Sequence, residues 1–424
     1  MIESIKLKIM GEEKEIPSGL TFADVAKDYQ DKFKYPIILA KAKNKYRELS
    51  DYIVDNDDIE FVDLKDRMGN LVYVNSLVYL ASYAVTEAFG RNAKIIVKYS
   101  IDKGIYIETN FDLDIEKCKI LKAKMKELAE NNISITKCRV ERYEAIEYFE
   151  LNKETSKVNL LKYATNTHIT LYKIGGMYDY FFTLMPPSTG CLKHFDIHFL
   201  NPRGFVLLFP TVYIDGIKKY EHHPKLFEVF REYQKWAEIM KISNVPALNT
   251  IVSNGRADDI IRIDETLQSN RLLNLAKDIV SRKDQVKIIL IAGPSSSGKT
   301  TSCRKLSMYL RSFGLEPREI SMDNYFVDRE KTPLDENGEP DFECLEAIDI
   351  KKFDSDVKKL LNGEKVRLQI FNFVKGKSEP GEDEVALGKN EVLIIEGIHA
   401  LNDKILTSID RKKKFKIYLS PLTI

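Results

Sequence analysis

The stretch Gly293-Pro-Ser-Ser-Ser-Gly-Lys-Thr-Thr301 follows the apolar segment Val286 to Ala292 and precedes a helix-like pattern from Arg304 to Phe313. It matches the phosphate-binding loop (P-loop) pattern G-x-x-x-x-G-K-[ST] at every constrained position. Two glycines let the backbone fold around a phosphate, so that successive N–H groups and the positive end of the next helix point at it. We therefore predict that the chain binds a nucleotide.

The residue types within the loop predict separate roles. Lys299 is expected to reach the β- and γ-phosphates and to take part in catalysis, and the Thr300 hydroxyl is expected to bind Mg²⁺. No N-K-x-D guanine signature follows the loop, which favours ATP over GTP. A Gly/Ser turn without a ligand is the alternative, but the β-branched strand before the loop disfavours it. The predicted nucleotide-binding residues are Gly293, Ser295, Ser296, Ser297, Gly298, Lys299, Thr300 and Thr301.

Length and composition indicate a multidomain protein with a net charge close to zero. The chain has 424 residues, which is more than one hydrophobic core usually serves, and 65 Lys and Arg balance 64 Asp and Glu. The five cysteines form no C-x-x-C pair, as expected for reduced thiols rather than disulfides or a zinc cage. With no signal peptide or membrane span recognisable, we predict a cytoplasmic protein with no membrane partner, and we leave its oligomeric state open.

The first 64 residues alternate apolar and polar positions as strands do. Ile2 to Ile9 and Glu15-Ile16 predict a hairpin that turns at Gly11, and Thr21 is positioned to cap a short helix. With the segment Ile16-Pro-Ser-Gly-Leu-Thr-Phe22, this order resembles a TGS domain, the ubiquitin-like β-grasp module of threonyl-tRNA synthetases and some regulatory GTPases. Another small β-grasp fold is the alternative. We expect a TGS-like domain at residues 1–64.

Residues 65–225 predict an α+β domain, with a helix from Val72, strands near residues 94–99 and 104–109, and a helix from Ile115 to Glu130. Their order resembles the second domain of threonyl-tRNA synthetases, where a metal site serves editing of mischarged tRNA. The resemblance places the family's H-x-x-x-H motif on Asn75 and Tyr79, and its later Cys-and-His motif within 183–189. Amides and phenols are poor zinc ligands, so we expect no zinc. RNA or protein contact through the two N-terminal domains stays open.

Residues 226–284 predict a helical connector. Helices are expected at Leu226 to Ala237 and Ile260 to Val280, with a loop from Pro246 to Gly255 between them. Basic residues of this segment are interleaved with acids, which favours a solvated helical surface over an RNA-binding face.

From residue 285 the pattern of strand, loop, helix and strand predicts a parallel sheet with helices on both faces. Asp323 follows the second strand and Glu396 ends a later one, so both should reach the carboxyl edge of the sheet, where ligands bind. Asp323 is our candidate general base, which would accept the proton of a substrate hydroxyl. Glu396 is positioned like a Walker-B acid, so it is the second candidate Mg²⁺ ligand and a candidate catalytic residue that could polarise a water; a role only in ending the strand is the alternative. A turn-capping role for Asp323 is the alternative from spacing alone.

The loop, the segment Ser321-Met-Asp-Asn-Tyr-Phe326 and the segment Val392-Leu-Ile-Ile-Glu-Gly-Ile398 together resemble the uridine kinase and phosphoribulokinase family. That resemblance implies a P-loop kinase that uses ATP and Mg²⁺ to phosphorylate a hydroxyl of a nucleoside or other small sugar-containing substrate. It also implies that Asp323 is the catalytic base. The alternative from another class is a regulatory or RNA-associated nucleotide-binding protein without kinase activity.

The predicted substrate contacts are Tyr325, Glu343 and Phe371, and they depart from the uridine kinase pattern. The family's Asp-His-Pro run, which grips the ribose, is here Glu343-Cys-Leu. Its pyrimidine-reading Tyr and His correspond to Phe371 and Gly376, which cannot make the same hydrogen bonds. Since such bonds decide specificity by orders of magnitude, we expect a nucleoside other than uridine, or another polyol.

The sequence after Asn402 to Ile409 offers one more strand, Lys414 to Leu419, and no arginine-bearing lid of the kind found in the family. We therefore expect a kinase domain that is incomplete at its C-terminus, binds nucleotide and transfers phosphate poorly. Arg329 and the basic segment 411–414 are the candidates to replace the lid. The predicted chain is thus multidomain, α+β and α/β, with domains at residues 1–64, 65–225, 226–284 and 285–424.

Overall fold

A computed structural model describes residues 4–55, 57–336 and 338–420 of the chain. The chain divides into two compact units, with the division between Asn254 and Gly255. This division lies inside the predicted connector, and the predicted domain limits themselves stay a prediction. Within the described ranges, the helices are too short or too polar to cross a bilayer.

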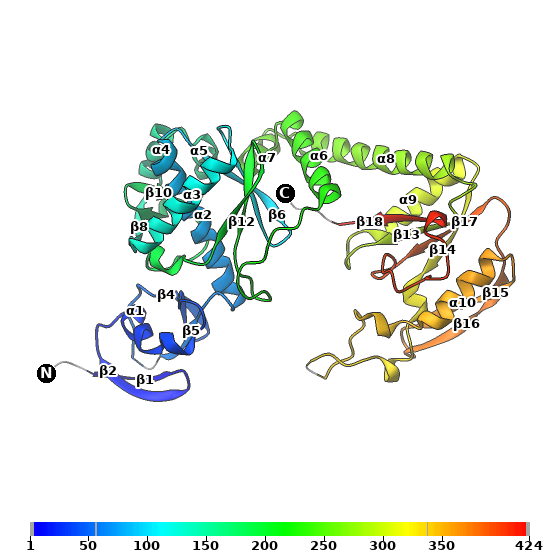
Figure 1. The fold of residues 1–424 in the computed structure, drawn as a ribbon, viewed down its shortest axis with the longest axis horizontal. Helices are drawn as coiled ribbons and strands as arrows, with labels where there is room; N and C mark the ends of the chain where they lie inside the picture. The colour runs from blue at the N-terminus through cyan, green and yellow to red at the C-terminus, as the bar shows by residue number, and fades with distance from the viewer. Residues whose placement is uncertain (1–3, 56, 337, 421–424) are drawn as a thin grey trace. The chain divides into compact units, whose positions relative to one another are not determined.

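The first unit begins with a five-stranded mixed sheet in the order β2-β1-β5-β3-β4, drawn in blue in Figure 1. β1 pairs parallel with β5, the other neighbours are antiparallel, and helix α1 packs on the sheet, which is the β-grasp arrangement. The predicted capped helix is confirmed, since Thr21 and Asp24 form a reciprocal capping box. The predicted hairpin is confirmed from Ser4 onward, and Ile2, where it was expected to begin, lies outside the described residues. The elements are β1 Ser4–Ile9, β2 Glu12–Pro17, α1 Phe22–Ala26, β3 Leu39–Ala42, β4 Lys45–Glu48 and β5 Asp58–Val62.

The rest of the first unit is α+β, as predicted. Helices α2 and α3 pack on a four-stranded antiparallel sheet, β11-β12-β7-β6, and a second sheet has the order β10-β9-β8. Asp66 starts α2 by accepting hydrogen bonds from the N–H groups of Met68 and Gly69. The elements are α2 Arg67–Phe89, β6 Ile95–Ile101, β7 Gly104–Thr109, α3 Ile115–Glu130, β8 Ile135–Glu141, α4 Arg142–Leu151, α5 Thr155–Lys162, β9 His168–Ile174, β10 Met177–Asp179, β11 Asp196–Asn201 and β12 Gly204–Leu208.

A buried carboxylate joins the β-grasp sheet to the α+β part of the same unit. Glu48, at the end of β4, is 2% exposed and accepts hydrogen bonds from the Tyr172 hydroxyl and from the Met185 N–H at 3.2 Å. Lys137 also donates to its second oxygen at 3.2 Å. Because a buried carboxylate is costly without partners, these three donors fix the position of β4 against the α+β part.

The connector prediction is wrong in one respect. Residues 246–255 were expected to form a loop, but helix α7 occupies Val245–Ser253, after α6 at Pro224–Met240. The Asn244 side chain caps α7 by accepting from the Ala247 N–H, and Pro246 lies in the first turn, where a missing N–H costs nothing. The proline that suggested a loop is therefore a helix-start signal.

The second unit, coloured green-yellow to red in Figure 1, contains a four-stranded parallel sheet in the order β14-β17-β13-β18. The strands are linked by helices and by 3₁₀ turns, which include η3 at Met322–Tyr325. A two-stranded antiparallel hairpin, β15 and β16, lies outside this sheet. The elements are α8 Ala257–Ser281, β13 Ile288–Ala292, α9 Lys299–Ser312, β14 Glu316–Ser321, α10 Ile350–Leu361, β15 Val366–Asn372, β16 Lys377–Val385, β17 Glu391–Glu396 and β18 Lys414–Tyr418.

The side chains of β13 alternate between two hydrophobic cores. Ile289 and Ile291 pack with apolar residues of α8 and α9, while Ile288 and Leu290 pack with residues of α10 and η3. The sheet is therefore covered on both faces, which explains why its strands are almost continuously apolar. The predicted doubly covered parallel sheet is confirmed, and its carboxyl edge carries the residues of interest.

Candidate active site

The P-loop joins the carboxyl end of β13 to the amino end of α9. Ser296 and Gly298 have positive φ angles of 60° and 79°, so the chain turns sharply twice before the helix begins. Gly293 is buried, and a Cβ there would lie 2.3 Å from the carbonyl oxygen of Leu419, which follows β18. The first glycine of the motif is thus required by close backbone approach and the second by backbone conformation.

The loop has the properties that a bound polyphosphate requires. Ser295, Ser296 and Thr300 are exposed at the positive end of α9. The Ser297 hydroxyl is buried and has no hydrogen-bond partner within the described part of the chain. Lys299 Nζ donates to the carbonyl oxygen of Pro294 at 2.9 Å, so the ammonium group is held over the loop. The residues present therefore fit a nucleotide phosphate chain.

Asp323 lies at the same edge of the sheet, in the η3 turn that follows β14. Although the residue is exposed, the surrounding protein desolvates its carboxyl and raises the pKa, and the positive charge of Lys299 opposes this rise. Both residues follow the carboxyl ends of parallel strands, so the candidate base lies at the edge of the sheet that carries the P-loop lysine.

Glu396 ends β17, between the two strands that carry the other candidates. Its register partners are Ser321 on β14 and Ile291 on β13. The Ser321 hydroxyl donates to Glu396 Oε1 at 3.0 Å. No role for Ser321 could be predicted from the sequence, because a serine at a strand end has many uses and only the register shows that it meets Glu396.

The three predicted substrate residues have different environments. Tyr325 is 1% exposed, packs on Phe353, and its hydroxyl lies 3.3 Å from Asp356 Oδ2. Phe371 is 4% exposed, whereas Glu343 is exposed. Tyr325 thus belongs to the hydrophobic core in this structure, and a substrate contact from any of the three stays a prediction.

The hairpin of β15 and β16 is fastened to the Asp323 turn by a residue that sequence reasoning missed. Asn324, next to Asp323, accepts from the Phe371 N–H at 3.3 Å, and its carbonyl oxygen accepts from the Ser378 hydroxyl at 3.2 Å. Both strands of the hairpin therefore contact the turn that carries the candidate base. Phe371 reaches the neighbourhood of Asp323 through these contacts.

The two candidate replacements for a lid lie in different places. Arg329 donates from Nη2 to the Phe373 carbonyl oxygen at 2.8 Å and packs against Gly376, so it holds the hairpin turn. The segment 411–414 leads into the start of β18, where Lys414 pairs with Ile288 at the amino end of β13. This is the edge of the sheet opposite the P-loop, so the basic segment does not face the phosphate site.

The positions that correspond to the synthetase metal site come together in the first unit, but with other chemistry. Asn75 Nδ2 donates to the Thr183 hydroxyl oxygen at 3.1 Å. Tyr79 is fully buried, with its hydroxyl oxygen 2.7 Å and 2.8 Å from two backbone carbonyl oxygens. In residues 4–55, 57–336 and 338–420, no group of three or more His, Cys, Asp or Glu side chains is placed to hold a metal ion.

Residues 288–423 match the model of the Phosphoribulokinase / Uridine kinase family. The matched segment contains the P-loop, Asp323 and Glu396, and it coincides with the parallel sheet. The second unit therefore has a kinase-like P-loop fold of this family.

The N-terminal part of the chain is similar to threonine–tRNA ligases. The enzyme of Francisella tularensis subsp. tularensis is 25% identical over 189 residues, and that of Thermotoga petrophila is 27% identical over 202 residues. These matches cover 44% and 46% of this chain. The chain spans 30% of the length of either ligase.

Two solved kinases are similar to part of the chain. A possible uridine kinase from Bacillus stearothermophilus has 23% sequence identity and a TM-score of 0.30, over 35% of this chain and 79% of its own. A D-glycerate 3-kinase from Cryptococcus neoformans has 18% identity and a TM-score of 0.23, over 30% of this chain and 52% of its own.

Proposed function

We propose that the chain is an ATP-dependent kinase that phosphorylates a hydroxyl of a nucleoside or related small sugar-containing substrate. The observation that carries the proposal is that Asp323 and Lys299 lie at the same edge of the parallel sheet, where the P-loop follows β13. A carboxylate across from a phosphate-binding lysine is the arrangement that in-line phosphoryl transfer to an alcohol needs.

Each residue has a proposed task. The loop amides and Lys299 bind the β- and γ-phosphates, and Asp323 orients the acceptor hydroxyl and accepts its proton as the phosphorus–oxygen bond forms. Thr300 and Glu396 would hold Mg²⁺, which when bound neutralises charge on the phosphates. Ser321 orients Glu396. The match to the kinase family supports ATP and Mg²⁺ as ligands.

The acceptor is proposed to differ from uridine. Phe371 lies beside the Asp323 turn, and a phenyl ring offers no hydrogen bond to a base or sugar. The exposed Glu343 supplies a longer acid than the aspartate of uridine kinases. A screen of nucleosides and polyols with ATP and Mg²⁺ tests this, and turnover of uridine or cytidine as fast as any other compound would refute it.

The decisive experiment is Asp323→Asn, assayed in the full chain. Turnover of the acceptor found in the screen should fall by about 10²- to 10⁴-fold, because general-base catalysis contributes that much. The Kd of ATP should stay within about twofold. Asp403→Asn is the matched control, since that side chain is 95% exposed and pairs only with Lys416 in the described residues.

The result also separates the kinase from a nucleotide sensor. Turnover that survives in Asp323→Asn would refute the assignment of the base. A chain that binds ATP through Lys299 but phosphorylates no acceptor in the screen would instead support the regulatory nucleotide-binding alternative.

A further inference from the structure

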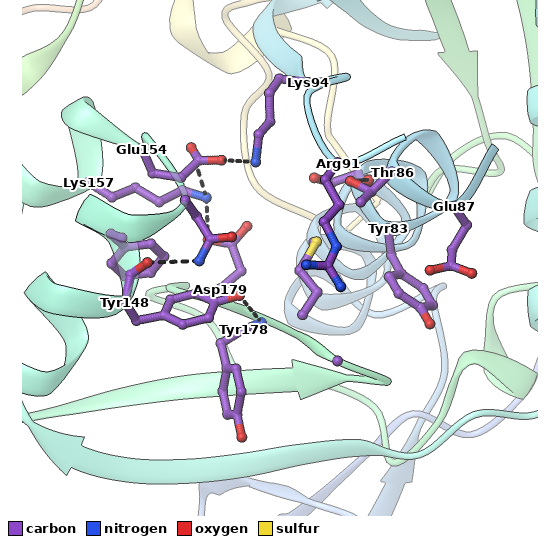
Figure 2. Close-up of a pocket in the computed structure, with 15 residues that line it drawn as sticks. Tyr83, Thr86, Glu87, Arg91, Lys94, Tyr148, Glu154, Lys157, Tyr178 and Asp179 are labelled. Atoms are coloured by element: carbon purple, nitrogen blue, oxygen red, sulfur yellow. Dashed lines mark hydrogen bonds and ion pairs between the residues drawn. The ribbon is translucent and has the colours of Figure 1, made fainter. Parts of the chain in front are cut away.

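A cavity lies within the first unit, far along the sequence from the P-loop. It has a volume of about 320 Å³, which is within the range of small-molecule sites, and it lies between the end of α2, helices α4 and α5, and β10. Figure 2 shows charged side chains that converge on it from both sides. The charged residues that line it are Glu87, Arg91, Lys94, Glu154, Lys157 and Asp179.

One wall of this cavity is a network of ion pairs. Lys157 Nζ lies 2.7 Å from Asp179 Oδ1 and 3.7 Å from Glu154 Oε2, and Lys94 Nζ lies 2.7 Å from Glu154 Oε1. Asp179 is only 7% exposed, and burial raises the pKa of its carboxyl although Lys157 opposes the rise. Charges buried in this way are costly for stability. Where they line a cavity, they are candidates for ligand binding.

The charges of this wall pair with one another, so the other charged side chains that line the cavity are Arg91 and Glu87. Lys157 and Lys94 match Asp179 and Glu154, whereas Arg91 has no hydrogen bond or ion pair to any residue that the structure describes. In Figure 2 its guanidinium group extends into the cavity opposite the Lys157 network. A guanidinium group binds carboxylate or phosphate through two parallel hydrogen bonds. The cavity is therefore suited to a ligand with an anionic group at Arg91.

The opposite end of such a ligand must satisfy both Lys157 and Asp179. Lys157 can only donate hydrogen bonds and the ionised Asp179 can only accept them, whereas a hydroxyl group does both. A ligand ammonium group would meet the positive charge of Lys157. An apolar group would cover the ion pair without replacing its bonds to water. Hydroxyl groups are thus the best complement to this wall.

We propose that this cavity binds a small organic anion that carries several hydroxyl groups, with its phosphate or carboxylate at Arg91 and its hydroxyls at Lys157 and Asp179. The proposal uses only residues of the first unit. It holds whether or not the P-loop unit is a kinase.

The test is calorimetric titration of the full chain, without nucleotide, with four probes. These are ribose 5-phosphate, gluconate, inorganic phosphate and ribose. At least one of the first two should bind about tenfold or more tightly than both inorganic phosphate and ribose, and which one binds identifies the anionic group. Equal affinity for ribose or inorganic phosphate, or no binding of any probe at millimolar concentration, would overturn the proposal.

Two variants place the binding in this cavity. Arg91→Ala should weaken the tight probe by about tenfold or more, while Arg47→Ala, an exposed arginine on β4, should leave its affinity unchanged. Asp179→Asn keeps the shape but removes the charge, and it should weaken the hydroxylated probe more than inorganic phosphate. Unchanged binding to Arg91→Ala would overturn the assignment. Since Arg91 is exposed, that variant should fold even if Asp179→Asn does not.

Discussion

The hydroxyl of Ser321 donates a 3.0 Å hydrogen bond to Oε1 of Glu396, across the register that places the two residues side by side at the ends of β14 and β17. A residue of the neighbouring strand β14 thereby fixes the orientation of the Glu396 side chain. One carboxylate oxygen is engaged, and the lone pairs of the other are left for a cation. The bond connects two segments that are 75 residues apart in the sequence.

Ser321→Ala should therefore change how nucleotide binding depends on Mg²⁺. Loss of a hydrogen bond to a partly exposed carboxylate is worth about 1 kcal/mol, so the Mg²⁺ concentration for half-maximal ATP binding should rise about three- to tenfold. A fluorescent ATP analogue titrated with Mg²⁺ measures this. Ser312→Ala, at the exposed end of α9, is the control. An identical Mg²⁺ requirement in Ser321→Ala and the parent would show that Ser321 does not position a metal ligand.

The raised pKa of Asp323 predicts the pH dependence of the proposed reaction. The base must be ionised, so kcat/KM should fall as the pH decreases, with an acidic limb above the ordinary Asp value of 3.8. A limb at or below 3.8 in the pH–rate profile would contradict the desolvation of this carboxyl.

The raised pKa of Asp323 also predicts that its ionised carboxylate lowers the stability of the folded state at neutral pH. A carboxyl whose pKa is raised by folding destabilises the folded state above that pKa, and the penalty disappears as the pH falls through it. Asp323→Asn should therefore be at least as heat-stable as the parent at pH 7, although it is inactive. Thermal unfolding at pH 7 and pH 4 measures this, and a clear loss of stability at pH 7 would indicate a structural role.

Gly293→Ala should disturb both the sheet and the loop. The added Cβ would lie 2.3 Å from the Leu419 carbonyl oxygen, which is backbone and cannot rotate away. We expect a loss of about 1–3 kcal/mol in the free energy of unfolding, together with weaker ATP binding. Gly388→Ala is the control, because its Cβ would meet only ordinary contacts, with the nearest atom at 3.5 Å. Urea unfolding and ATP titration of both variants provide the comparison, and equal behaviour would refute the role of close approach.

Tyr79→Phe should destabilise the first unit. The Tyr79 side chain is fully buried, and its hydroxyl lies within hydrogen-bond distance of the carbonyl oxygens of Tyr172 and Met177 and accepts from the Ile174 N–H at 3.2 Å. Removing it leaves buried backbone groups unpaired, which costs about 1–3 kcal/mol. Tyr143→Phe, whose side chain is on the surface, should change little in the same urea unfolding experiment. A Tyr79→Phe variant as stable as the parent would mean that water replaces the hydroxyl.

Much of the fold could be predicted because local pattern and tertiary structure agree. The strand before the P-loop, the capped helix after Thr21 and helix α3 at Ile115–Glu130 each follow from periodicity and end signals. The α7 helix was missed because Pro246 is both a loop signal and a first-turn residue, and only the Asn244 cap distinguishes them. Strand β4 was missed because its four residues are too short a pattern to show alternation.

The candidate site could be predicted only where a motif fixes the spacing. The P-loop, Asp323 and Glu396 come to one edge because parallel strands place their carboxyl ends together. The directions of individual side chains could not be predicted. Nothing in the sequence shows that the Tyr325 hydroxyl points to Asp356, or that Asn324 fastens the hairpin, since both depend on contacts between distant segments.

The buried Glu48 restricts how the first 254 residues can be divided. A cut after residue 64 would separate this carboxylate from the Tyr172 hydroxyl and the Met185 amide. Both pieces would then expose polar groups that have lost their partners, together with apolar surface that is buried in the intact unit. We therefore expect the five-stranded sheet and the α+β part to remain together in any stable truncated or fused version of the protein. Residues 1–64 alone would therefore be less stable than the same residues within the whole unit.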